Sequence, residues 1–194
     1  MAGMQLTGTV TPDRPLLVLA VAEEAAHLDA DLPVLLTGMG KVNAAVALAT
    51  VLAGGPKPAE VVNLGTAGAL RPGLSGRTHQ IGTVLQHDLD GRVLAKLTGQ
   101  TYGGPLTLAT EGLTLATGDL FVSDPAARDR LAEQAHLVDM EGYALATAAQ
   151  RAGVPIRLVK HVSDEAGEGA AKAWRETVDD CAKVLADWVR ENLK

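Results

Sequence analysis

The sequence predicts an α/β fold in which helices cover both faces of one sheet. Two observations lead to this prediction. Short apolar runs, typical of buried strands, alternate along the chain with alanine-rich or amphipathic segments, typical of helices. Glycine and proline end several of these segments, as expected for the connections of a compact domain. Alternation of this kind favours a layered α/β domain.

Seven apolar segments are predicted strands. The run that follows Pro15 comes first, and the second run ends at Gly38-Met39-Gly40. A small-residue turn, Gly65-Thr66-Ala67-Gly68, is expected after the third. The clearest strands are residues 16–21, 34–37, 60–64 and 156–162, and weaker patterns add 82–86, 113–117 and 138–140.

Four longer segments are predicted helices. Residues 41–52 are rich in alanine and lack internal glycine or proline, until Gly54-Gly55-Pro56 ends the pattern. Asp124 is the expected N-cap of the next helix. The others are residues 125–135, 141–152 and the long amphipathic stretch 170–193, and residues 23–28 suggest a further short helix. Residues 71–105 are the least regular part of the chain.

Length and composition indicate a single domain over residues 1–194, with residues 1–14 as a short N-terminal extension. Apolar residues make up 47% of the chain, enough for a sizeable core. The net charge of -6 argues against a nucleic-acid partner. The lone Cys181 fits a reducing compartment, and neither a spanning apolar run nor a secretory signal is recognisable. We therefore expect a cytoplasmic protein without a membrane partner.

Acidic residues follow three of the predicted strands. Glu24, Glu141 and Asp164 each come directly after an apolar run. Each alone is explained by capping of a helix N-terminus. Strand ends of one sheet meet at one rim, however, so the three acids are expected to lie together. Such a trio suits cleavage of an N-glycosidic bond, which needs an acid for the leaving base, a carboxylate for water, and a carboxylate near the ribose.

Five motifs, in order along the chain, resemble the 5'-methylthioadenosine/S-adenosylhomocysteine nucleosidases, the hydrolase branch of the nucleoside phosphorylase superfamily. The resemblance implies a three-layer αβα fold with a central mixed sheet, a small nucleoside as substrate, and no cofactor. The motifs are Gly38-Met39-Gly40-Lys41-Val42-Asn43-Ala44-Ala45, Asn63-Leu64-Gly65-Thr66-Ala67-Gly68-Ala69-Leu70, Thr117-Gly118-Asp119-Leu120-Phe121-Val122, Val138-Asp139-Met140-Glu141 and Val162-Ser163-Asp164.

The resemblance also implies roles for single residues. Glu24 matches the acid that holds the attacking water, although Glu23 is an alternative alignment. Asp164 matches the acid that serves N7 of the purine, and Ser163 the neighbour that orients it. Met140 and Glu141 match the pair that binds the ribose.

Further positions are implied to contact the substrate. Phe121 matches an aromatic that stacks on the base, and Val122 supplies backbone contacts. Trp174 matches an aromatic over the site, with core packing as the alternative for both rings. Thr66 is expected near the water, and the small residues Ala67 and Gly68 allow the backbone to approach the ligand.

Phosphorylases of this superfamily bind phosphate through arginines. Residues 61–65 and 21–24 contain no cation, so water is the expected nucleophile. Lys160 stands where the family usually has an arginine before the Ser-Asp pair, so it is expected to bind substrate, although lysine cannot make the bidentate contacts of arginine. Residues 91–97 lack the aromatic that the family places near the 5' substituent, which leaves the 5' group open. A futalosine hydrolase, a phosphorylase and a non-catalytic nucleoside-binding protein are the competing hypotheses.

Two further expectations concern metals and assembly. His87, Asp88 and Asp90 are too few to close a metal shell, so no metal is expected. The helix at 41–52 is apolar on most of its circumference. Such a helix is covered either by a second copy of the chain or by another helix of the same chain. With the family resemblance, this predicts a homodimer whose site lies near the interface.

Overall fold

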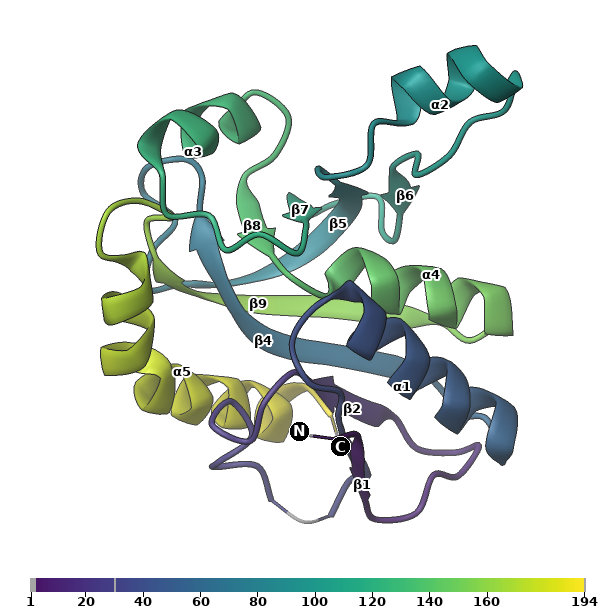
Figure 1. The fold of residues 1–194 in the computed structure, drawn as a ribbon. Helices are drawn as coiled ribbons and strands as arrows, with labels where there is room; N and C mark the ends of the chain where they lie inside the picture. The colour runs from purple at the N-terminus through teal and green to yellow at the C-terminus, as the bar shows by residue number, and fades with distance from the viewer. Residues whose placement is uncertain (1–2, 30, 194) are drawn as a thin grey trace.

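The computed structural model describes residues 3–29 and 31–193, so both ends of the predicted 1–194 domain lie outside the described residues. Its central sheet combines parallel and antiparallel pairs, and helices lie on both of its faces (Figure 1). This confirms the predicted three-layer αβα architecture with a mixed sheet. The strands are β1 Gln5–Thr7, β2 Leu16–Leu19, β3 Val34–Leu36, β4 Val61–Ala69, β5 Thr78–Gln86, β6 Leu106–Thr107, β7 Leu113–Thr117, β8 Leu137–Asp139 and β9 Ile156–Asp164.

Strands β4 and β9 form the centre of the sheet. They run parallel from the pair Val61 and Ile156 to the pair Gly68 and Asp164. β2 and β3 continue the sheet in parallel on one side, and β1 adds an antiparallel edge within the predicted N-terminal extension. On the other side β9 pairs antiparallel with β5. β5 in turn pairs with β7, β7 with β8, and β8 with β4, so these five strands form a closed ring of pairs. The carboxyl ends of β2, β4 and β9 therefore lie at one edge.

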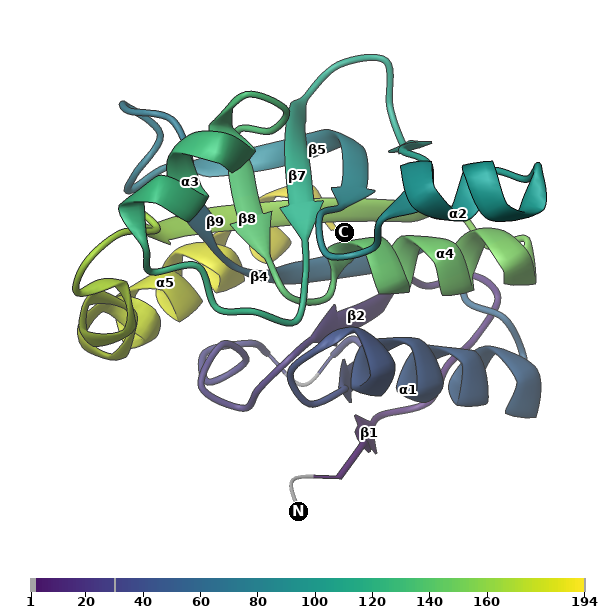
Figure 2. The same ribbon diagram turned by 45° about the horizontal axis from the view of Figure 1, so that its top comes forward.

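Helices α1 (Lys41–Gly54) and α4 (Gly142–Ala152) lie side by side on one face of the sheet (Figures 1 and 2). Helix α5 (Ala170–Asn192) packs on the other face. Apolar side chains of both layers are fully buried, which supplies the main stabilisation of the fold. On the first face the core includes Leu16, Val18, Leu48, Leu145 and Leu158, and on the α5 face it includes Leu17, Leu19, Val62, Leu64, Val159 and Leu185.

Local signals explain the ends of several helices. Helix α3 (Pro125–Ala132) begins at Asp124, whose side chain accepts from Ala127 N at 2.8 Å, and it ends earlier than the predicted residue 135. Helix α4 ends at Gly153, whose φ of 69° suits glycine. Within the described residues, no helix combines the length and apolar character that crossing a bilayer requires.

The small-residue segment at 65–68 is not the turn that the sequence suggested. β4 continues through it to Ala69, because β9 keeps pairing with it as far as Gly68, with a shift of register after Ala67. Its glycines instead provide space. A Cβ on Gly65 would lie 3.2 Å from Glu24 Oε1, and one on Gly68 would lie 3.0 Å from the Cβ of Ala166. The strand can therefore pass close under the site.

Two other predictions differ from the structure. Residues 23–28 form turns rather than a helix, with Ala25 N bonded to Ala22 O and Leu28 N to Ala25 O. The irregular stretch 71–105 contains helix α2 (Gly91–Thr98), which was not predicted, and its predicted strand 82–86 is the second half of the longer β5. Asp90 caps that helix by accepting from Val93 N, and Gly99 ends it in the left-handed conformation. The sequence analysis missed α2 because the helix is short and buries none of its residues.

Candidate active site

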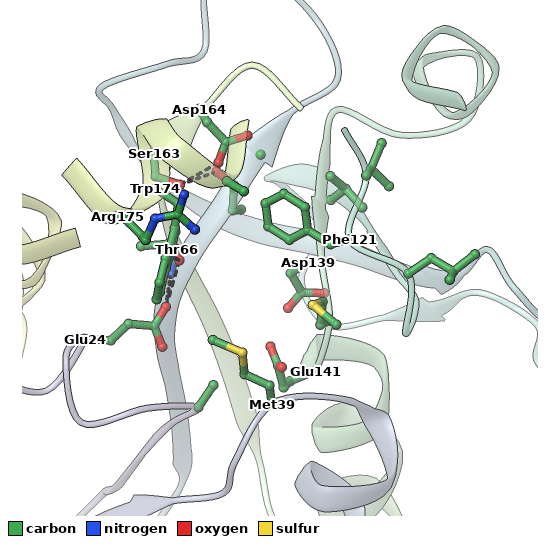
Figure 3. A pocket seen from close by; sticks show the side chains of 18 residues that line it. Glu24, Met39, Thr66, Phe121, Asp139, Glu141, Ser163, Asp164, Trp174 and Arg175 are labelled. Carbon is green, nitrogen blue, oxygen red and sulfur yellow. Dashed lines mark hydrogen bonds between the residues drawn. The ribbon is translucent and has the colours of Figure 1, made fainter. Parts of the chain in front are cut away.

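A cavity of about 220 Å³ opens at the edge of the sheet where β2, β4 and β9 end (Figure 3). It gathers nearly all of the predicted site residues from six separate segments of the chain. The predicted residues that line it are Glu24, Thr66, Ala67, Gly68, Phe121, Val122, Met140, Glu141, Ser163, Asp164 and Trp174. The lining also includes Ala20, Met39, Leu120, Val138, Asp139, Ala171 and Arg175, which were not among the predicted site residues.

Glu24 reaches the cavity from the turn after β2. Its Oε1 accepts two hydrogen bonds from Thr66, at 2.7 Å from the backbone N–H and 2.8 Å from the hydroxyl. Its Oε2 is buried and has no hydrogen-bond partner among the described residues. Glu23, the alternative for the same role, is exposed and does not line the cavity. The geometry thus favours Glu24 as the acid of this turn.

Glu141 lies between β8 and α4, buried on the opposite wall from Glu24 (Figure 3). Gly40 donates its N–H to Glu141 Oε1 at 2.7 Å, and the φ of 92° at position 40 requires a glycine. Burial and then the charge of Asp139 raise the pKa of Glu141 to about 8. The Gly38-Met39-Gly40 turn therefore holds a carboxyl group, and Met39 also lines the cavity.

Lys160 does not line the cavity, contrary to its prediction as a substrate contact. It lies in the middle of β9 with only 1% of its surface exposed. Its Nζ is 2.9 Å from Asp139 Oδ2, and Asp139 also accepts from Thr117 Oγ1 and Gly142 N. Burial opposes the charge on Lys160, but Asp139, Glu141 and Glu24 together raise its pKa. Lys160 is thus an internal counterion for the acids of the site.

Asp164 ends β9 and closes the top of the cavity in Figure 3. Its Oδ2 accepts from Ser163 Oγ at 2.9 Å and its Oδ1 from Ala166 N at 2.8 Å. Ala166 is fully buried with a φ of 47°, a strained conformation for a residue with a side chain. Burial raises the pKa of Asp164 above its usual value, against the effect of these hydrogen bonds. A carboxyl group of this kind is suited to donate a proton.

Phe121 stands across the cavity from Trp174 (Figure 3), and 47% of its surface is exposed. Its position disfavours the core-packing alternative. Asp119, two residues earlier, accepts from Lys41 N at 2.8 Å and donates its own N–H to Asp88 Oδ2 at 2.9 Å. Asp88 also pairs with Lys41 Nζ. The loop that carries Phe121 is thus held against the start of α1 by this network.

The same network explains the acids near His87 that suggested a metal site. Asp88 holds the Phe121 loop and Asp90 caps α2. In the part of the chain that the structure describes, no group of three His, Cys, Asp or Glu side chains is placed to hold a metal ion.

Arg175 lines the cavity but was not predicted from the sequence. Among the unpredicted lining residues it matters most chemically, because it brings a positive charge. Residues 21–24 and 61–65, where phosphate-binding arginines were expected, lie at strands β2 and β4, whereas Arg175 comes from α5. Ala171, Trp174 and Arg175 follow the i, i+3, i+4 spacing of one helix face, so the expected position of Trp174 over the site could have indicated Arg175 as well.

Comparisons with known proteins agree with this geometry. A model of the phosphorylase superfamily matches residues 27–193. A 5'-methylthioadenosine/S-adenosylhomocysteine nucleosidase of Bacillus thuringiensis (strain Al Hakam) is 32% identical in an alignment that covers 81% of this chain and 78% of that protein.

Two solved structures share the fold. A futalosine hydrolase mutant of Helicobacter pylori strain 26695 superposes with a TM-score of 0.80 at 19% identity, covering 93% of this chain and 97% of that one. The Streptococcus pneumoniae 5'-methylthioadenosine/S-adenosylhomocysteine nucleosidase, solved with a transition-state inhibitor, gives a TM-score of 0.75 at 23% identity, with 89% and 95% covered. The sequence match, the superfamily model and the shared fold lead to one conclusion: the chain belongs to the 5'-methylthioadenosine/S-adenosylhomocysteine nucleosidase family of the phosphorylase superfamily.

Proposed function

We propose that this enzyme hydrolyses the N-glycosidic bond of a 5'-modified adenosine, such as methylthioadenosine or S-adenosylhomocysteine. The products are adenine and the free ribosyl sugar. The observation that carries this proposal is the state of Glu24, which lines the cavity and whose buried Oε2 has no hydrogen-bond partner among the described residues. A buried carboxylate oxygen of this kind is suited to accept a hydrogen bond from an attacking water.

The three acids have separate tasks in the proposed reaction. Asp164, whose pKa is raised, gives its proton to N7 of the purine as the bond between C1' and the base nitrogen breaks. The water oxygen bonds to C1', and the water loses its proton to Glu24 Oε2. Glu141, once ionised, accepts hydrogen bonds from the ribose hydroxyls and stabilises the cationic ring. Phe121 supplies a face on which the base stacks.

A phosphorylase is the less favoured alternative. Phosphate carries negative charge, and the Glu24 carboxylate beside the nucleophile position would repel it. Among the described residues that line the cavity, Arg175 is the one cation, whereas binding of a dianion normally uses several donors. Incubating the protein with a nucleoside panel, with and without phosphate, tests this choice. Free sugar as product supports hydrolysis, and a saturable increase with phosphate that yields ribose 1-phosphate contradicts it.

Arg175 favours one group of substrates over another. A cation in the cavity lining is suited to bind a carboxylate on the 5' substituent, as S-adenosylhomocysteine has and methylthioadenosine lacks. Futalosine, another nucleoside with an acidic 5' substituent, is the second candidate substrate for the same reason. The nucleoside panel should therefore include all three. An Arg175→Ala variant that loses activity equally on neutral and acidic substrates would argue against this role.

The enzyme is further proposed to be a cytoplasmic homodimer. Helix α4 covers one side of α1, but Val42 and Val46 on its outer face remain 72% and 61% exposed. Helix α2 stands away from the sheet (Figure 1) and exposes Val93 and Leu97. Leu120, which lines the cavity, is also largely exposed. A second copy that packs on these side chains would bury them and cover the open side of the cavity.

A further inference from the structure

A chain of hydrogen bonds links helix α5 to the acid of the water site. Trp174 donates its indole N–H to Thr66 Oγ1 at 2.9 Å, and Thr66 Oγ1 lies 2.8 Å from Glu24 Oε1 (Figure 3). An indole nitrogen can only donate, and a threonine hydroxyl has a single proton. Because the Thr66 oxygen accepts from Trp174, its own proton is directed to Glu24. The direction of the whole chain is therefore fixed.

The two oxygens of Glu24 consequently differ. Oε1 receives both of its hydrogen bonds from Thr66, one from the backbone and one from the hydroxyl. Oε2 receives none from the described residues, although it is buried. The lone pairs of Oε2 stay available for water.

Helix α5 also holds the turn that carries Glu24. His27 contacts Asp179 of α5 at 2.7 Å, and Ala25 and Leu28 pack in the same cluster as Leu185. Trp174 and the Glu24 turn are thus fixed to one rigid helix. This arrangement holds in place the hydrogen-bond relay, which runs from Trp174 through Thr66 to Glu24.

We propose that Trp174 is a positioning residue for the nucleophile, acting through the Thr66 hydroxyl on Glu24. The proposal rests on the hydrolysis proposed above. Without the indole N–H, the Thr66 hydroxyl is free to rotate. It then spends part of its time away from Glu24, where its oxygen competes with Oε2 for the protons of the water. Trp174 therefore affects the reaction step rather than the affinity for the nucleoside.

The Trp174→Phe variant tests this, because phenylalanine keeps an aromatic ring but lacks the N–H. We expect kcat to fall about tenfold while KM changes by less than about twofold. Thr66→Val removes the hydroxyl and keeps the backbone N–H to Glu24. Adding Trp174→Phe to Thr66→Val should cost nothing further, because the relay is already broken. Trp188→Phe, on the same helix over Arg157, is the matched control and should leave kcat unchanged.

A loss confined to KM, or losses that add in the double variant, would overturn the proposal. Nuclear magnetic resonance gives a readout that does not depend on activity. The chain has two tryptophans, so the spectrum contains two indole N–H signals, which Trp174→Phe assigns. Thr66→Val should shift the Trp174 signal and not that of Trp188. An unmoved Trp174 signal refutes the relay. Failure of the wild-type protein to release a base from any nucleoside refutes only the proposed function.

Discussion

The floor and the rim of the cavity are built from different kinds of side chain. The floor consists of four buried acidic residues, Glu24, Asp139, Glu141 and Asp164, with Lys160 behind them, and each of the four carboxyl groups has at least one hydrogen-bond partner inside the chain. The rim includes three large exposed apolar residues, Met39, Leu120 and Phe121, beside the exposed Ala171 and Arg175 of α5.

This difference indicates which parts of the site a single chain completes. Buried polar groups are normally paired within the fold, and in the floor one copy supplies partners to every carboxyl group, with Glu24 Oε2 as the oxygen left open. Exposed apolar side chains are stabilised when something covers them, either the nucleoside or a second copy. We therefore expect changes in the floor to affect chemistry and stability, and changes in the rim to affect recognition and assembly.

The largest effect is expected from Asp164→Asn in the floor. An amide cannot supply a proton to the leaving base at neutral pH, so kcat should fall by about 10³-fold. Near-native melting behaviour should accompany this loss, since the amide oxygen can still accept from Ala166 N. Single-turnover kinetics on methylthioadenosine provide the measurement. Turnover close to that of the wild type would remove Asp164 from the acid role.

Glu24→Gln should lower kcat by about 10²-fold, because the amide accepts a proton from water poorly. Substrate affinity should be retained, since Glu24 acts on water rather than on the nucleoside. Glu23→Gln is the matched control at the exposed neighbouring position and should behave like the wild type. If Glu23→Gln proves to be the inactive variant, the assignment of the water-holding acid is wrong.

Lys160→Met should destabilise the protein by about 3–5 kcal/mol, because it leaves Asp139 charged and buried without its counterion. Urea unfolding measures the change. The double variant Lys160→Met/Asp139→Asn removes the stranded charge and should recover part of the loss. Equal stability of the single and double variants would contradict the counterion role of Lys160.

The pH dependence of binding tests Glu141. Its pKa of about 8 lies above that of a free glutamate, so at neutral pH most of the ligand-free enzyme carries the proton. The ionised form is expected to bind the ribose hydroxyls, so affinity should increase as the pH rises through 8. In the inactive Asp164→Asn background, Kd should fall about tenfold between pH 7 and pH 9. With Glu141→Gln added, Kd should no longer change with pH over this range.

The smallest effect on chemistry is expected at the apolar surface. Val46→Glu on the outer face of α1 should convert the proposed dimer to a monomer and raise KM a few fold, while kcat stays nearly constant. Light scattering at low micromolar concentration gives the mass. Lys172→Glu, on the exposed side of α5, is the control and should stay dimeric. A wild-type mass near 20 kDa would contradict the dimer itself.

The floor was more predictable from the sequence than the rim. Glu24, Glu141 and Asp164 follow apolar runs, and the alternation of strands and helices brings such positions to one edge. The role of Lys160 was not predictable, because a lysine inside an apolar strand is equally consistent with a site residue and with a buried counterion. Its partner Asp139 is set by the pairing of β4, β8 and β9.

Two errors have a common physical origin. The segment 65–68 looked like a turn because glycine is rare inside strands, yet its small residues make room for Glu24 and Ala166. Helix α2 was missed because it is short and buries none of its residues. In both places the contacts with the rest of the chain, close at residues 65–68 and few at α2, are what a local sequence pattern does not reveal.

The strained backbone at Ala166 has a consequence for engineering. A left-handed alanine costs on the order of 1–2 kcal/mol, and here it places an N–H against Asp164, the proposed acid. Selection for heat resistance alone would therefore favour glycine at position 166, which adopts this conformation without strain. Such a variant would hold Asp164 less firmly, so gains in thermal tolerance at this position should come with slower catalysis.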